Sequence, residues 1–524
     1  MKAVNGLQMG LVDKYSIERL GIPGVVLMEN AALQIVRHVE KFFADEPYRT
    51  KTVTIVAGKG NNAGDAFAVA RHLIIKGYST IIYCLFDRAF LMGDTSVNLE
   101  ILYRLGADVR PLYETQHLME FKKDLSKAQL IVDGIFGTGF RGQVKGFPAD
   151  VMEAINLSSV YVLSIDIASG IESASGRVTE GCIKADKTVT FELPKIGQLV
   201  FPGAAYTGEL AVESISMPRE SIDSVEVDTF LTDIQTVRAM LPKRGPDINK
   251  GSCGKAAIIT GSQGMAGSGC LASKACLRTG SGLVYIGAPK SLLSIYQTVV
   301  PEAVGVGLTE YNGVLGQNSI EGILTLIKKC DVAAIGPGLS TNEYIYYIIS
   351  NIADKIDVPV VLDADALNAM ARDTGLFSRF GNKVVITPHP GEMARLTGLD
   401  IDYIKENRFE VARKYAKLWG VTLVLKGART IISDSSGKVH INPTGNSGMA
   451  TAGSGDSLTG IITSLMGQGA DSYDAAVAGV FLHGLAGDYA ARHKGEYGLT
   501  AMDIVESIPE AIGEVLSSAA TDLP

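Results

Sequence analysis

Cysteine is scarce in this sequence, and long apolar runs are missing from it. The six cysteines include no Cys-x-x-Cys pair, which disfavours both a zinc site and a framework of disulfides. No uncharged apolar stretch reaches the ~18 residues of a membrane-spanning helix, and the N-terminal segment lacks the apolar centre of a signal peptide. We therefore expect reduced thiols, no membrane association and a cytoplasmic location.

Positive charge is also limited. The 48 Lys and Arg residues stand against 56 Asp and Glu residues, the net charge is -8, and no long basic run is present to neutralise a phosphate backbone. This balance disfavours nucleic acid as the main partner. The chain has no evident internal repeat, and its 524 residues exceed what one hydrophobic core usually serves, so two domains are expected.

Short β-branched runs recur through the chain, and each is followed by a glycine-rich turn and a helix-like segment. In the first half the runs begin at Thr52, Leu130 and Val160, and this alternation predicts a parallel α/β sheet. The charged segment 213–230 interrupts the alternation. It then restarts, in runs that begin at Ala256, Val332, Val358, Lys383 and Thr422. Ligands of open α/β sheets bind beyond the carboxyl ends of the strands, so two sheets predict two sites.

A glycine-rich turn, GKGNNAGDA at 58–66, follows the first strand and leads into an apolar helix-like run. Its glycines let backbone amides approach an anion, and the N-terminus of the helix adds partial positive charge there. The turn would therefore suit a phosphate group. The alternative is a tight connection without a ligand, which the adjacent Asn61 and Asn62 weigh against.

Two further strands end in a carboxylate: Asp133 precedes GIFGTGFRGQ, and Asp166 precedes IASG. A buried carboxylate is costly without a partner, so each is expected to hold a residue, a ligand or a cation, although either could instead cap a helix. Asn62, Asp133 and Ser169 offer oxygen atoms from three adjacent strand ends. Oxygen ligands of this type suit a hard monovalent or divalent cation.

Five motifs occur in order: MEN from Met28, the GxGNNxGD turn, DGIFGTGFRG, DIASG, and TVTFELPKIG from Thr188. With them, residues 1–220 resemble the NAD(P)H-hydrate epimerase domain, which implies a Rossmann-like fold. The resemblance implies that Asn62, Asp133 and Ser169 bind potassium. It also implies that the hydrated dinucleotide is bound by Asn61, Asn62, Ala63, Gly64, Asp65, Gly137, Thr138, Gly139, Phe140, Arg141, Gly142, Gln143 and Asp166.

The sequence departs from the family pattern at three alanines. Ala63 and Ala66 replace typical glycines, and Ala168 replaces a typical proline. A Cβ at position 63 or 66 requires a negative φ there. Asp133 is the candidate general acid or base for epimerisation because it ends a strand that faces the expected pocket, and this role competes with its metal-binding role.

The segment GNSGMATAGSGDSLTG, at 445–460, leads into a second apolar helix pattern. A Gly-Ser-Gly turn that opens a helix forms an anion hole from backbone amides, and Asp456 lies at its mouth. Phosphoryl transfer needs positioning, charge neutralisation and a carboxylate near the attacking hydroxyl. Asp456 is therefore the candidate catalytic carboxylate, and an ordinary helix N-cap is the alternative.

With LDADAL from Leu362, TPHPGE from Thr387 and KGART from Lys426, this segment resembles the NAD(P)H-hydrate dehydratase domain, which has a ribokinase-like fold. The similarity begins near Lys243, the second domain is placed at 228–524, and Asn249 stands where the family commonly has histidine. The resemblance implies substrate contacts by Gly267, Gly338, His389 and Asp456. It implies a site for ADP, with Mg²⁺, at Lys426, Gly427, Ala428, Arg429, Thr430 and Gly455.

Together the two resemblances imply repair of hydrated nicotinamide cofactors. R and S forms of NADHX and NADPHX would be epimerised, and the S form would be dehydrated at the expense of ADP through a phosphorylated intermediate, giving AMP and phosphate. The alternative is a vitamin-alcohol kinase in the C-terminal half, with a non-catalytic nucleotide-binding module before it. The preferred cofactor stays open, and a homo-oligomer is expected.

Overall fold

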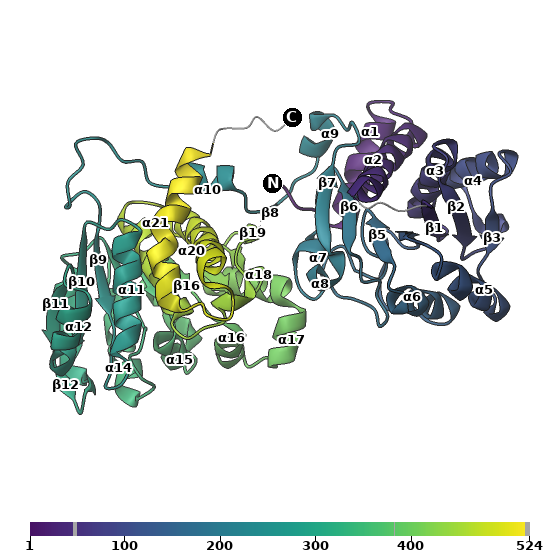
Figure 1. Ribbon diagram of the computed structural model, residues 1–524. Helices are drawn as coiled ribbons and strands as arrows, with labels where there is room; N and C mark the ends of the chain where they lie inside the picture. The colour runs from purple at the N-terminus through teal and green to yellow at the C-terminus, as the bar shows by residue number, and fades with distance from the viewer. Residues whose placement is uncertain (46–49, 382, 519–524) are drawn as a thin grey trace. The chain divides into compact units, whose positions relative to one another are not determined.

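The computed structural model describes residues 1–45, 50–381 and 383–518. The chain divides into two compact units, Met1–Thr229 and Phe230–Pro524, each built around its own sheet (Figure 1). The division falls at the end of the charged segment 213–230 that separates the two series of predicted strands.

The first unit contains a seven-stranded sheet in the order β3-β2-β1-β4-β5-β6-β7. All six neighbouring pairs are parallel, as in Rossmann-like folds. The order reverses between β1 and β4, so a crevice at the carboxyl ends of these two strands is the expected ligand position. The strands are β1 (Thr52–Ala57), β2 (Ser79–Cys84), β3 (Val109–Pro111), β4 (Leu130–Gly134), β5 (Tyr161–Ile165), β6 (Lys187–Phe191) and β7 (Glu209–Glu213).

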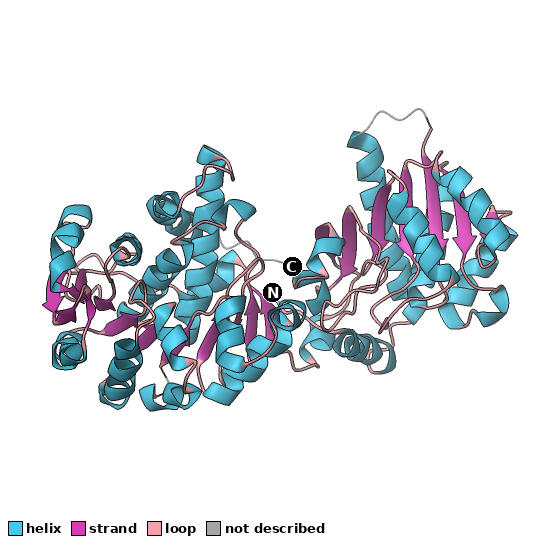
Figure 2. Ribbon diagram, turned by 90° about the horizontal axis from the view of Figure 1, so that it is seen from below, coloured by secondary structure: helices cyan, strands magenta, loops and turns pink. Residues whose placement is uncertain are grey.

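Helices cover both faces of this sheet (Figure 2), because alternate strand residues enter two separate cores. Val53 and Ile55 pack into the core that contains α2 and α3, whereas Val56 packs into the core that contains α5 and α6. The helices of the unit are α1 (Gly6–Glu18), α2 (Gly24–Asp45), α3 (Asn61–Ile75), α4 (Gly93–Arg104), α5 (Thr115–Leu125), α6 (Phe147–Leu157), α7 (Ile196–Leu199), α8 (Ala204–Thr207) and α9 (Arg219–Asp223).

The second unit contains a ten-stranded sheet in the order β11-β10-β9-β14-β15-β16-β17-β18-β19-β8. The strands from β11 to β17 are parallel, and β18 and β19 continue the sheet in antiparallel fashion. The strands are β8 (Thr229–Leu231), β9 (Lys255–Ile259), β10 (Leu283–Pro289), β11 (Val304–Leu308), β14 (Val332–Ile335), β15 (Val360–Leu362), β16 (Val384–Ile386), β17 (Thr422–Leu425), β18 (Ile431–Ser433) and β19 (Val439–Ile441); β12 (Glu310–Tyr311) and β13 (Val314–Leu315) form a separate pair.

The core of the second unit lies between this sheet and α11, α19, α20 and α21. Every residue of α19 from Ser457 to Met466 is buried, so this helix is held on all sides and fixes whatever its N-terminus presents. The helices are α10 (Ile234–Met240), α11 (Ala266–Arg278), α12 (Leu293–Val299), α13 (Ile320–Ile327), α14 (Glu343–Ile352), α15 (Asp365–Met370), α16 (Pro390–Thr397), α17 (Ile401–Glu406), α18 (Arg408–Trp419), α19 (Ser454–Gly467), α20 (Ser472–Lys494) and α21 (Ala501–Ser517).

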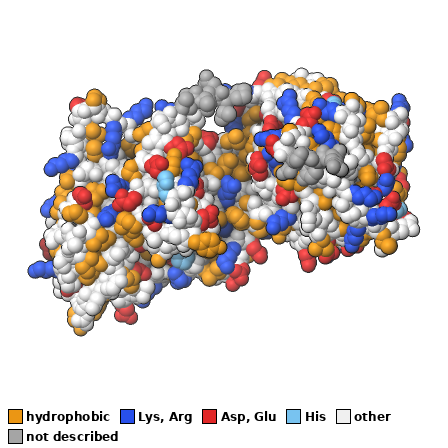
Figure 3. Space-filling view, viewed as in Figure 1, with side chains coloured by type: hydrophobic (Ala, Val, Ile, Leu, Met, Phe, Trp, Pro, Cys, Tyr) orange, Lys and Arg blue, Asp and Glu red, His pale blue; other side chains and the backbone are white. Residues whose placement is uncertain are grey.

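The expected alternation of strands and helices is confirmed in both units, and each predicted run forms a parallel strand. The antiparallel extension through β18 and β19 was not expected, because these strands are short and carry no glycine-rich strand-end motif. All six cysteines are free and buried. Among the described residues, no helix is long and apolar enough to cross a membrane. Charges of both signs are intermingled on the face seen in Figure 3.

Candidate active sites

The first candidate site lies at the carboxyl edge of the first sheet, where β1 turns into α3. A Cβ at Gly58 would lie 1.9 Å from the carbonyl oxygen of Ile135, so only glycine fits this close approach of two strand-end loops. Gly60 occupies the N-cap of α3 and has no side chain with which to cap the helix. The Ala63 and Gly64 N–H groups donate to the Gly60 carbonyl oxygen, which leaves the Asn61 and Asn62 amides of the first turn for an anion, with Asn61 exposed at the opening.

Asn62, Asp133 and Ser169, which come from three strand ends, meet around the backbone of Phe136. The Asn62 amide donates to the Phe136 carbonyl oxygen at 3.0 Å, and the Phe136 N–H donates to Ser169 Oγ at 2.9 Å. Ser169 Oγ donates in turn to Asp133 Oδ1 at 2.6 Å. The fold therefore brings these three side chains to one segment of backbone, as the strand ends predicted.

The Asp133 carboxylate is fully buried and accepts four hydrogen bonds. Two come from the backbone N–H and the hydroxyl of Ser169, one from the Ser164 hydroxyl at 2.8 Å and one from the Ile135 N–H at 3.2 Å. Burial raises the pKa of Asp133, and the hydrogen bonds from Ser169 and Ser164 oppose this rise. These four hydrogen bonds fix the position of the carboxylate at the end of β4.

The loop after β4 is fastened to the segment that follows β5. The Ser173 hydroxyl donates to the Thr138 carbonyl oxygen at 2.9 Å, and the Gly142 N–H donates to Glu172 Oε1 at 2.9 Å. Gly137 lies against the Asn62 side chain, since a Cβ there would be 3.3 Å from Asn62 Cβ. Residues 61–65 and 137–143, predicted to bind one ligand, thus come together at one edge of the sheet.

The remaining predicted residues, 139–143, belong to the same loop after β4. The Phe140 ring lies 5.3 Å from the Phe136 ring, and Gln143 Oε1 accepts from the Thr179 hydroxyl at 3.0 Å. Gly139 and Arg141 lie between these fixed points, and Arg141 is exposed. The loop therefore has anchored ends and a central cation that faces solvent.

Asp166 forms an ion pair with Lys195, a residue that the sequence analysis did not single out. The Lys195 side chain is 1% exposed and that of Asp166 is 16% exposed, so the carboxylate forms the accessible tip of a buried pair. The Thr190 hydroxyl donates to Asp166 Oδ1 at 2.9 Å, and Lys195 Nζ donates to Thr190 Oγ1 at 2.8 Å. Asp166 has φ +60°, an uncommon conformation that concentrates at functional sites.

Two more carboxyl groups, Asp13 and Asp65, share the electrostatic surroundings of this pair. Burial, and then the charge of Asp166, raises the pKa of Asp13 to about 6, while Lys195 opposes the rise. Burial likewise raises the pKa of Asp65, and the negative charges of Asp166 and Asp13 add to it. The pKa values of Asp13 and Asp65 are therefore both raised beside the Asp166–Lys195 ion pair, and raised carboxyl pKa values of this kind are typical of acid–base sites.

The alanines that depart from the family pattern do not distort the turn. Ala63 and Ala66 belong to α3, their side chains are fully buried, and neither they nor Ala168 are among the non-glycine residues with positive φ in the described chain. The Ala66 Cβ packs directly against Gly134, where an added Cβ would lie only 2.7 Å away. The required negative φ is confirmed, so these methyl groups are compatible with the helix.

The second candidate site lies at the N-terminus of α19. Gly453 precedes the helix with φ +85°, and Gly455 and Asp456 occupy its first turn. A Cβ at Gly455 would lie 3.3 Å from Lys426 Nζ, which places the ammonium group beside the amides of that turn. Lys426 and Gly455, which were predicted to share the nucleotide site, are therefore neighbours. The Lys426 ammonium group and the backbone N–H groups at the start of α19 together suit a phosphate group.

Lys426 is fixed by a network of buried carboxylates. Its Nζ donates to Asp363 Oδ1 at 2.8 Å and lies 3.7 Å from Glu392 Oε2, and the Thr459 hydroxyl donates to Asp363 Oδ2 at 2.7 Å. Burial disfavours both charges, but each stabilises the other, so the pKa of Asp363 is lowered and that of Lys426 is raised. The pair stays ionised and holds the ammonium in place.

His389 caps α16 and remains half exposed. Its Nδ1 accepts from the Gly391 N–H at 3.0 Å, and its Nε2 lies 3.5 Å from Glu392 Oε1. Burial is the main cause that lowers its pKa, so the ring is neutral near pH 7. Nδ1 is therefore the acceptor, Nε2 carries the proton, and this N–H can be donated to a ligand.

Asp456 has the strongly shifted pKa expected of a proton acceptor. Burial, and then the charge of Asp363, raises this pKa to about 7, while a hydrogen bond from Ser268 opposes the rise. Gly338, with φ +65°, lies against Ser268, since a Cβ there would be 3.2 Å from Ser268 Cβ. Gly267 has open space on its Cβ side. The predicted substrate contacts at 267 and 338 therefore lie near the partner of Asp456.

The turn 426–430 is shaped by Arg408, a second residue that the sequence analysis missed. Its guanidinium is buried and donates to the carbonyl oxygens of Ala428 and Leu425, the latter at 3.1 Å. Burial lowers the pKa of Arg408 to about 10. Arg429, in the same turn, has φ +54° and Gly427 has φ +140°. Thr430 closes the turn through its hydroxyl, which donates to the Gly427 carbonyl oxygen at 2.8 Å.

Comparison with known proteins identifies both units. Residues 24–197 match the family described as YjeF-related protein N-terminus, and residues 256–510 match the family described as NAD(P)H-hydrate dehydratase. A bifunctional NAD(P)H-hydrate repair enzyme of Moorella thermoacetica is 41% identical over 97% of this chain and 96% of its own. The chain belongs to the family of bifunctional NAD(P)H-hydrate repair enzymes.

Other similar proteins have the same arrangement or part of it. The bifunctional NAD(P)H-hydrate repair enzyme of Thermofilum pendens is 36% identical over 98% of this chain and 96% of its own. A solved ADP/ATP-dependent NAD(P)H-hydrate dehydratase from Bacillus subtilis, co-crystallised with ATP/Mg²⁺, is 29% identical, with a TM-score of 0.47, and covers 54% of this chain and 98% of its own. Membership of the repair-enzyme family does not favour the alternative of a vitamin-alcohol kinase.

Two residues of the first candidate site, Lys195 and Asp13, were not found from the sequence, for different reasons. Lys195 lies inside the motif TVTFELPKIG, but nothing in that motif indicates that its ammonium reaches Asp166. Asp13 precedes the matched segment 24–197, and its helix has little amphipathic character. Because α1 has no clear apolar face, the sequence does not indicate that Asp13 points inward, and only the fold shows its neighbours.

Proposed function

We propose that this chain repairs both epimers of hydrated nicotinamide cofactors. The N-terminal unit interconverts R and S NAD(P)HX, and the C-terminal unit converts the S form to NAD(P)H at the expense of ADP. The observation that carries the proposal is the presence of both strand-end constellations in one chain whose full-length relatives are named for the repair of NAD(P)H hydrates. Two arrangements support the proposal: the carboxyl groups near Lys195 in one unit, and Lys426 beside the N-terminus of α19 in the other.

In the N-terminal unit, we assign proton exchange to Asp166 and the carboxyl groups near it, in place of Asp133. A protonated carboxyl group donates its proton to the C6 hydroxyl, the C–O bond breaks with assistance from the ring nitrogen, and water leaves. Water then adds to the opposite face of the ring and returns a proton to the carboxylate. Lys195 keeps Asp166 oriented and limits the charge of the cluster while the cationic ring forms.

We further propose that potassium binds at Asn62, Asp133 and Ser169. The donor set fits a hard cation of low charge, because it contains one carboxylate, one amide and one hydroxyl, all of them oxygen ligands next to the Phe136 carbonyl. Bound potassium would hold together the turn at 58–66 and the loop at 137–143. Ser169→Ala should weaken the dependence of epimerisation on potassium, whereas dehydration of the S epimer should be unchanged.

In the C-terminal unit, Asp456 accepts the proton of the C6 hydroxyl as its oxygen attacks the β-phosphorus of ADP. The bond from that phosphorus to the bridging oxygen breaks, and AMP leaves. The C6–O bond of the phosphate ester then breaks, assisted by the ring nitrogen, and phosphate leaves with the bonding electrons. Loss of a proton from C5 restores the ring double bond. Lys426 and the amides at Gly455 neutralise the transferred group.

Magnesium bound with the nucleotide would supply positive charge to the transferred phosphate, next to Lys426 and the amides at Gly455. The turn 426–430, shaped by Arg408, receives the nucleotide, and the Nε2–H of His389 contacts the hydrate. Gly267 gives the substrate close access to backbone, because the space on its Cβ side is open, whereas Gly338, where a Cβ would lie 2.6 Å from the Met265 carbonyl oxygen, lets its loop pack against α11 beside Ser268.

The test is absorbance near 340 nm during incubation of mixed R and S NADHX with the protein, ADP, magnesium and potassium. Recovery of reduced cofactor beyond the S share, faster than the spontaneous rate, is expected. Recovery that stops at the S share would refute the epimerase assignment. No recovery with ADP or ATP would refute the dehydratase assignment, and accumulation of a phosphorylated product without release of phosphate would indicate a kinase.

We also propose that the enzyme works in the cytoplasm and as a homo-oligomer. Six buried free thiols fit a reducing compartment. The exposed apolar side chains of α1 and α2, Leu7, Leu11, Val25 and Val26 among them, offer a surface that association would cover. The molar mass in solution, measured by light scattering, tests the assembly.

A further inference from the structure

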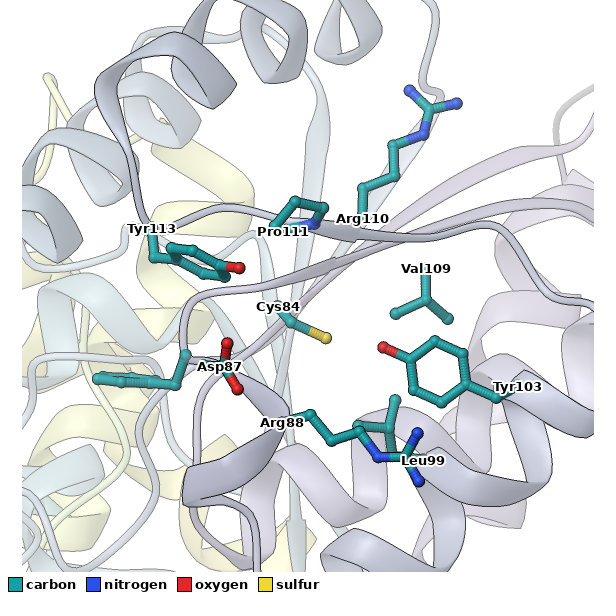
Figure 4. A pocket seen from close by; sticks show the side chains of 10 residues that line it. Cys84, Asp87, Arg88, Leu99, Tyr103, Val109, Arg110, Pro111 and Tyr113 are labelled. Carbon is teal, nitrogen blue, oxygen red and sulfur yellow. The ribbon is translucent and has the colours of Figure 1, made fainter.

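A cavity of about 180 Å³ lies at the carboxyl ends of β2 and β3, apart from the acid–base cluster (Figure 4). It is smaller than the roughly 300–1,000 Å³ of a site for a complete ligand, so it suits one end of a larger molecule. Its walls combine aromatic rings with a few charged groups, among them Phe86, Asp87, Arg88, Tyr103, Arg110 and Tyr113.

This cavity adjoins the phosphate-binding turn of the same sheet. The Thr95 hydroxyl of α4 donates to the Gly60 carbonyl oxygen at 3.2 Å, and Lys59 Nζ lies 5.3 Å from the centre of the Phe86 ring. Strand β2 is next to β1, with Cys84 opposite Ala57. From the end of β5, where Asp166 lies, to the end of β2 is three strand intervals, or about 14 Å. A diphosphate that links two ribosides bridges such a span.

The charged side chains of the cavity are not equally available. The Arg88 guanidinium pairs with Glu100 and stacks over the Tyr103 ring at 5.0 Å. Arg110 pairs with Asp108, Glu120 and Asp124, and its guanidinium points away from the other side chains labelled in Figure 4. Both cations are therefore already neutralised by carboxylates.

Asp87 differs from these arginines. Its Oδ1 accepts from the Ala89 N–H at 2.9 Å, whereas its Oδ2 accepts no hydrogen bond from the residues that the structure describes. A carboxylate oxygen without a donor attracts hydroxyl groups and repels a phosphate. The side chains of Tyr103 and Tyr113 are 43% and 40% exposed, and their rings offer apolar surface to a flat base.

We propose that this cavity receives the adenosine half of the hydrated dinucleotide, and that Asp87 makes the site prefer NADHX over NADPHX. Asp87 Oδ2 accepts from the ribose 2′-hydroxyl, and a 2′-phosphate at the same place meets a negative charge. The base lies among the rings of Phe86, Tyr103 and Tyr113, and the diphosphate reaches the N-terminus of α3. This inference rests on the epimerase function proposed above and names its substrate.

The test measures kcat/KM for epimerisation of R-NADHX and of R-NADPHX by the full chain, coupled to an excess of a separate dehydratase. The wild type is expected to favour NADHX at least tenfold. Asp87→Asn keeps an oxygen for the Ala89 N–H and removes the charge, so it should lower this preference about tenfold, mainly by improving NADPHX. Asp150→Asn, an equal charge change at an exposed position of α6, should leave the preference unchanged.

A wild type that treats both cofactors equally, or an Asp87→Asn variant with unchanged preference, would overturn the inference and leave the epimerase assignment intact. If the wild type accelerates neither R form, the proposed function fails, and this inference fails with it. Asp87→Ser, which retains a capping oxygen, supplies a second variant with the same expected gain for NADPHX. Dehydration of S-NADHX should be equal in all variants, because that reaction belongs to the other unit.

Discussion

Replacement of Asp456 by Asn should slow dehydration strongly and stabilise the C-terminal unit. The asparagine keeps the shape of the side chain but cannot take the proton of the substrate hydroxyl. Loss of a general base costs roughly 10²–10⁴-fold in rate. The pKa of Asp456 is raised to about 7 from an ordinary value near 3.8, a shift of about three units. At about 1.4 kcal/mol per unit, the ionised carboxylate costs the folded protein up to about 4 kcal/mol.

The direction of this effect with pH follows from the raised pKa. Between about pH 4 and pH 7, Asp456 is protonated in the folded protein and ionised in the unfolded chain, so its contribution to stability falls as pH rises and then levels off. The variant has no such contribution. The difference in free energy of unfolding between variant and wild type should therefore grow from pH 4 to pH 7 and stay constant above it.

The assays separate the two parts of this prediction. Dehydration of pure S-NADHX is followed at 340 nm from pH 5.5 to 8.5, and the wild-type rate should rise with pH through about 7. Urea denaturation at pH 5 and at pH 8 gives the stabilities. Asp402→Asn, at a side chain that is 81% exposed, serves as the control for loss of one charge. Full activity of Asp456→Asn, or lower stability at pH 8, would refute the reasoning.

Three further changes have separate expected outcomes. Lys195→Met should slow epimerisation roughly 10²–10⁴-fold and leave dehydration of the S epimer intact; equal loss of both would contradict the assignment. Gly58→Ala places a Cβ 1.9 Å from the Ile135 carbonyl oxygen and should destabilise the N-terminal unit by about 1–3 kcal/mol in thermal unfolding, whereas Gly60→Ala meets nothing within 4 Å. Arg408→Met should raise KM for ADP about tenfold with a smaller change in kcat, because two carbonyl oxygens of the nucleotide turn lose their donor.

The parts of both sites that are carried at strand ends could be predicted from the sequence. Parallel strands end at one edge of a sheet, so Asn62, Asp133 and Ser169 had to approach one another once their runs were identified as strands. Local pattern and sheet geometry are sufficient for such residues. The pairing of Lys426 with Gly455 was implied only by the family resemblance, and the fold brings the two residues together.

Other site residues depend on packing that no local pattern contains. Asp13 lies on a helix whose position depends on long-range contacts, including the hydrogen bond from the Gly6 N–H to Ser173. Arg408 is the first residue of α18, and its side chain contacts a turn that lies about twenty residues later in the sequence. Asp133 illustrates a different limit: the sequence left its two roles open, and the four hydrogen bonds that hold its carboxylate are visible only in the folded chain.

The short bridge between Val4 and Lys195 has a practical consequence for engineering. Val4 pairs with the backbone on both sides of Lys195, since its N–H donates to the Pro194 carbonyl oxygen at 3.0 Å and its carbonyl oxygen accepts from the Ile196 N–H at 2.9 Å. An affinity tag or fusion partner that pulls on residues 3–6 would therefore shift the ammonium beneath Asp166. A preparation modified in this way would lose epimerisation while every residue in contact with substrate kept its identity.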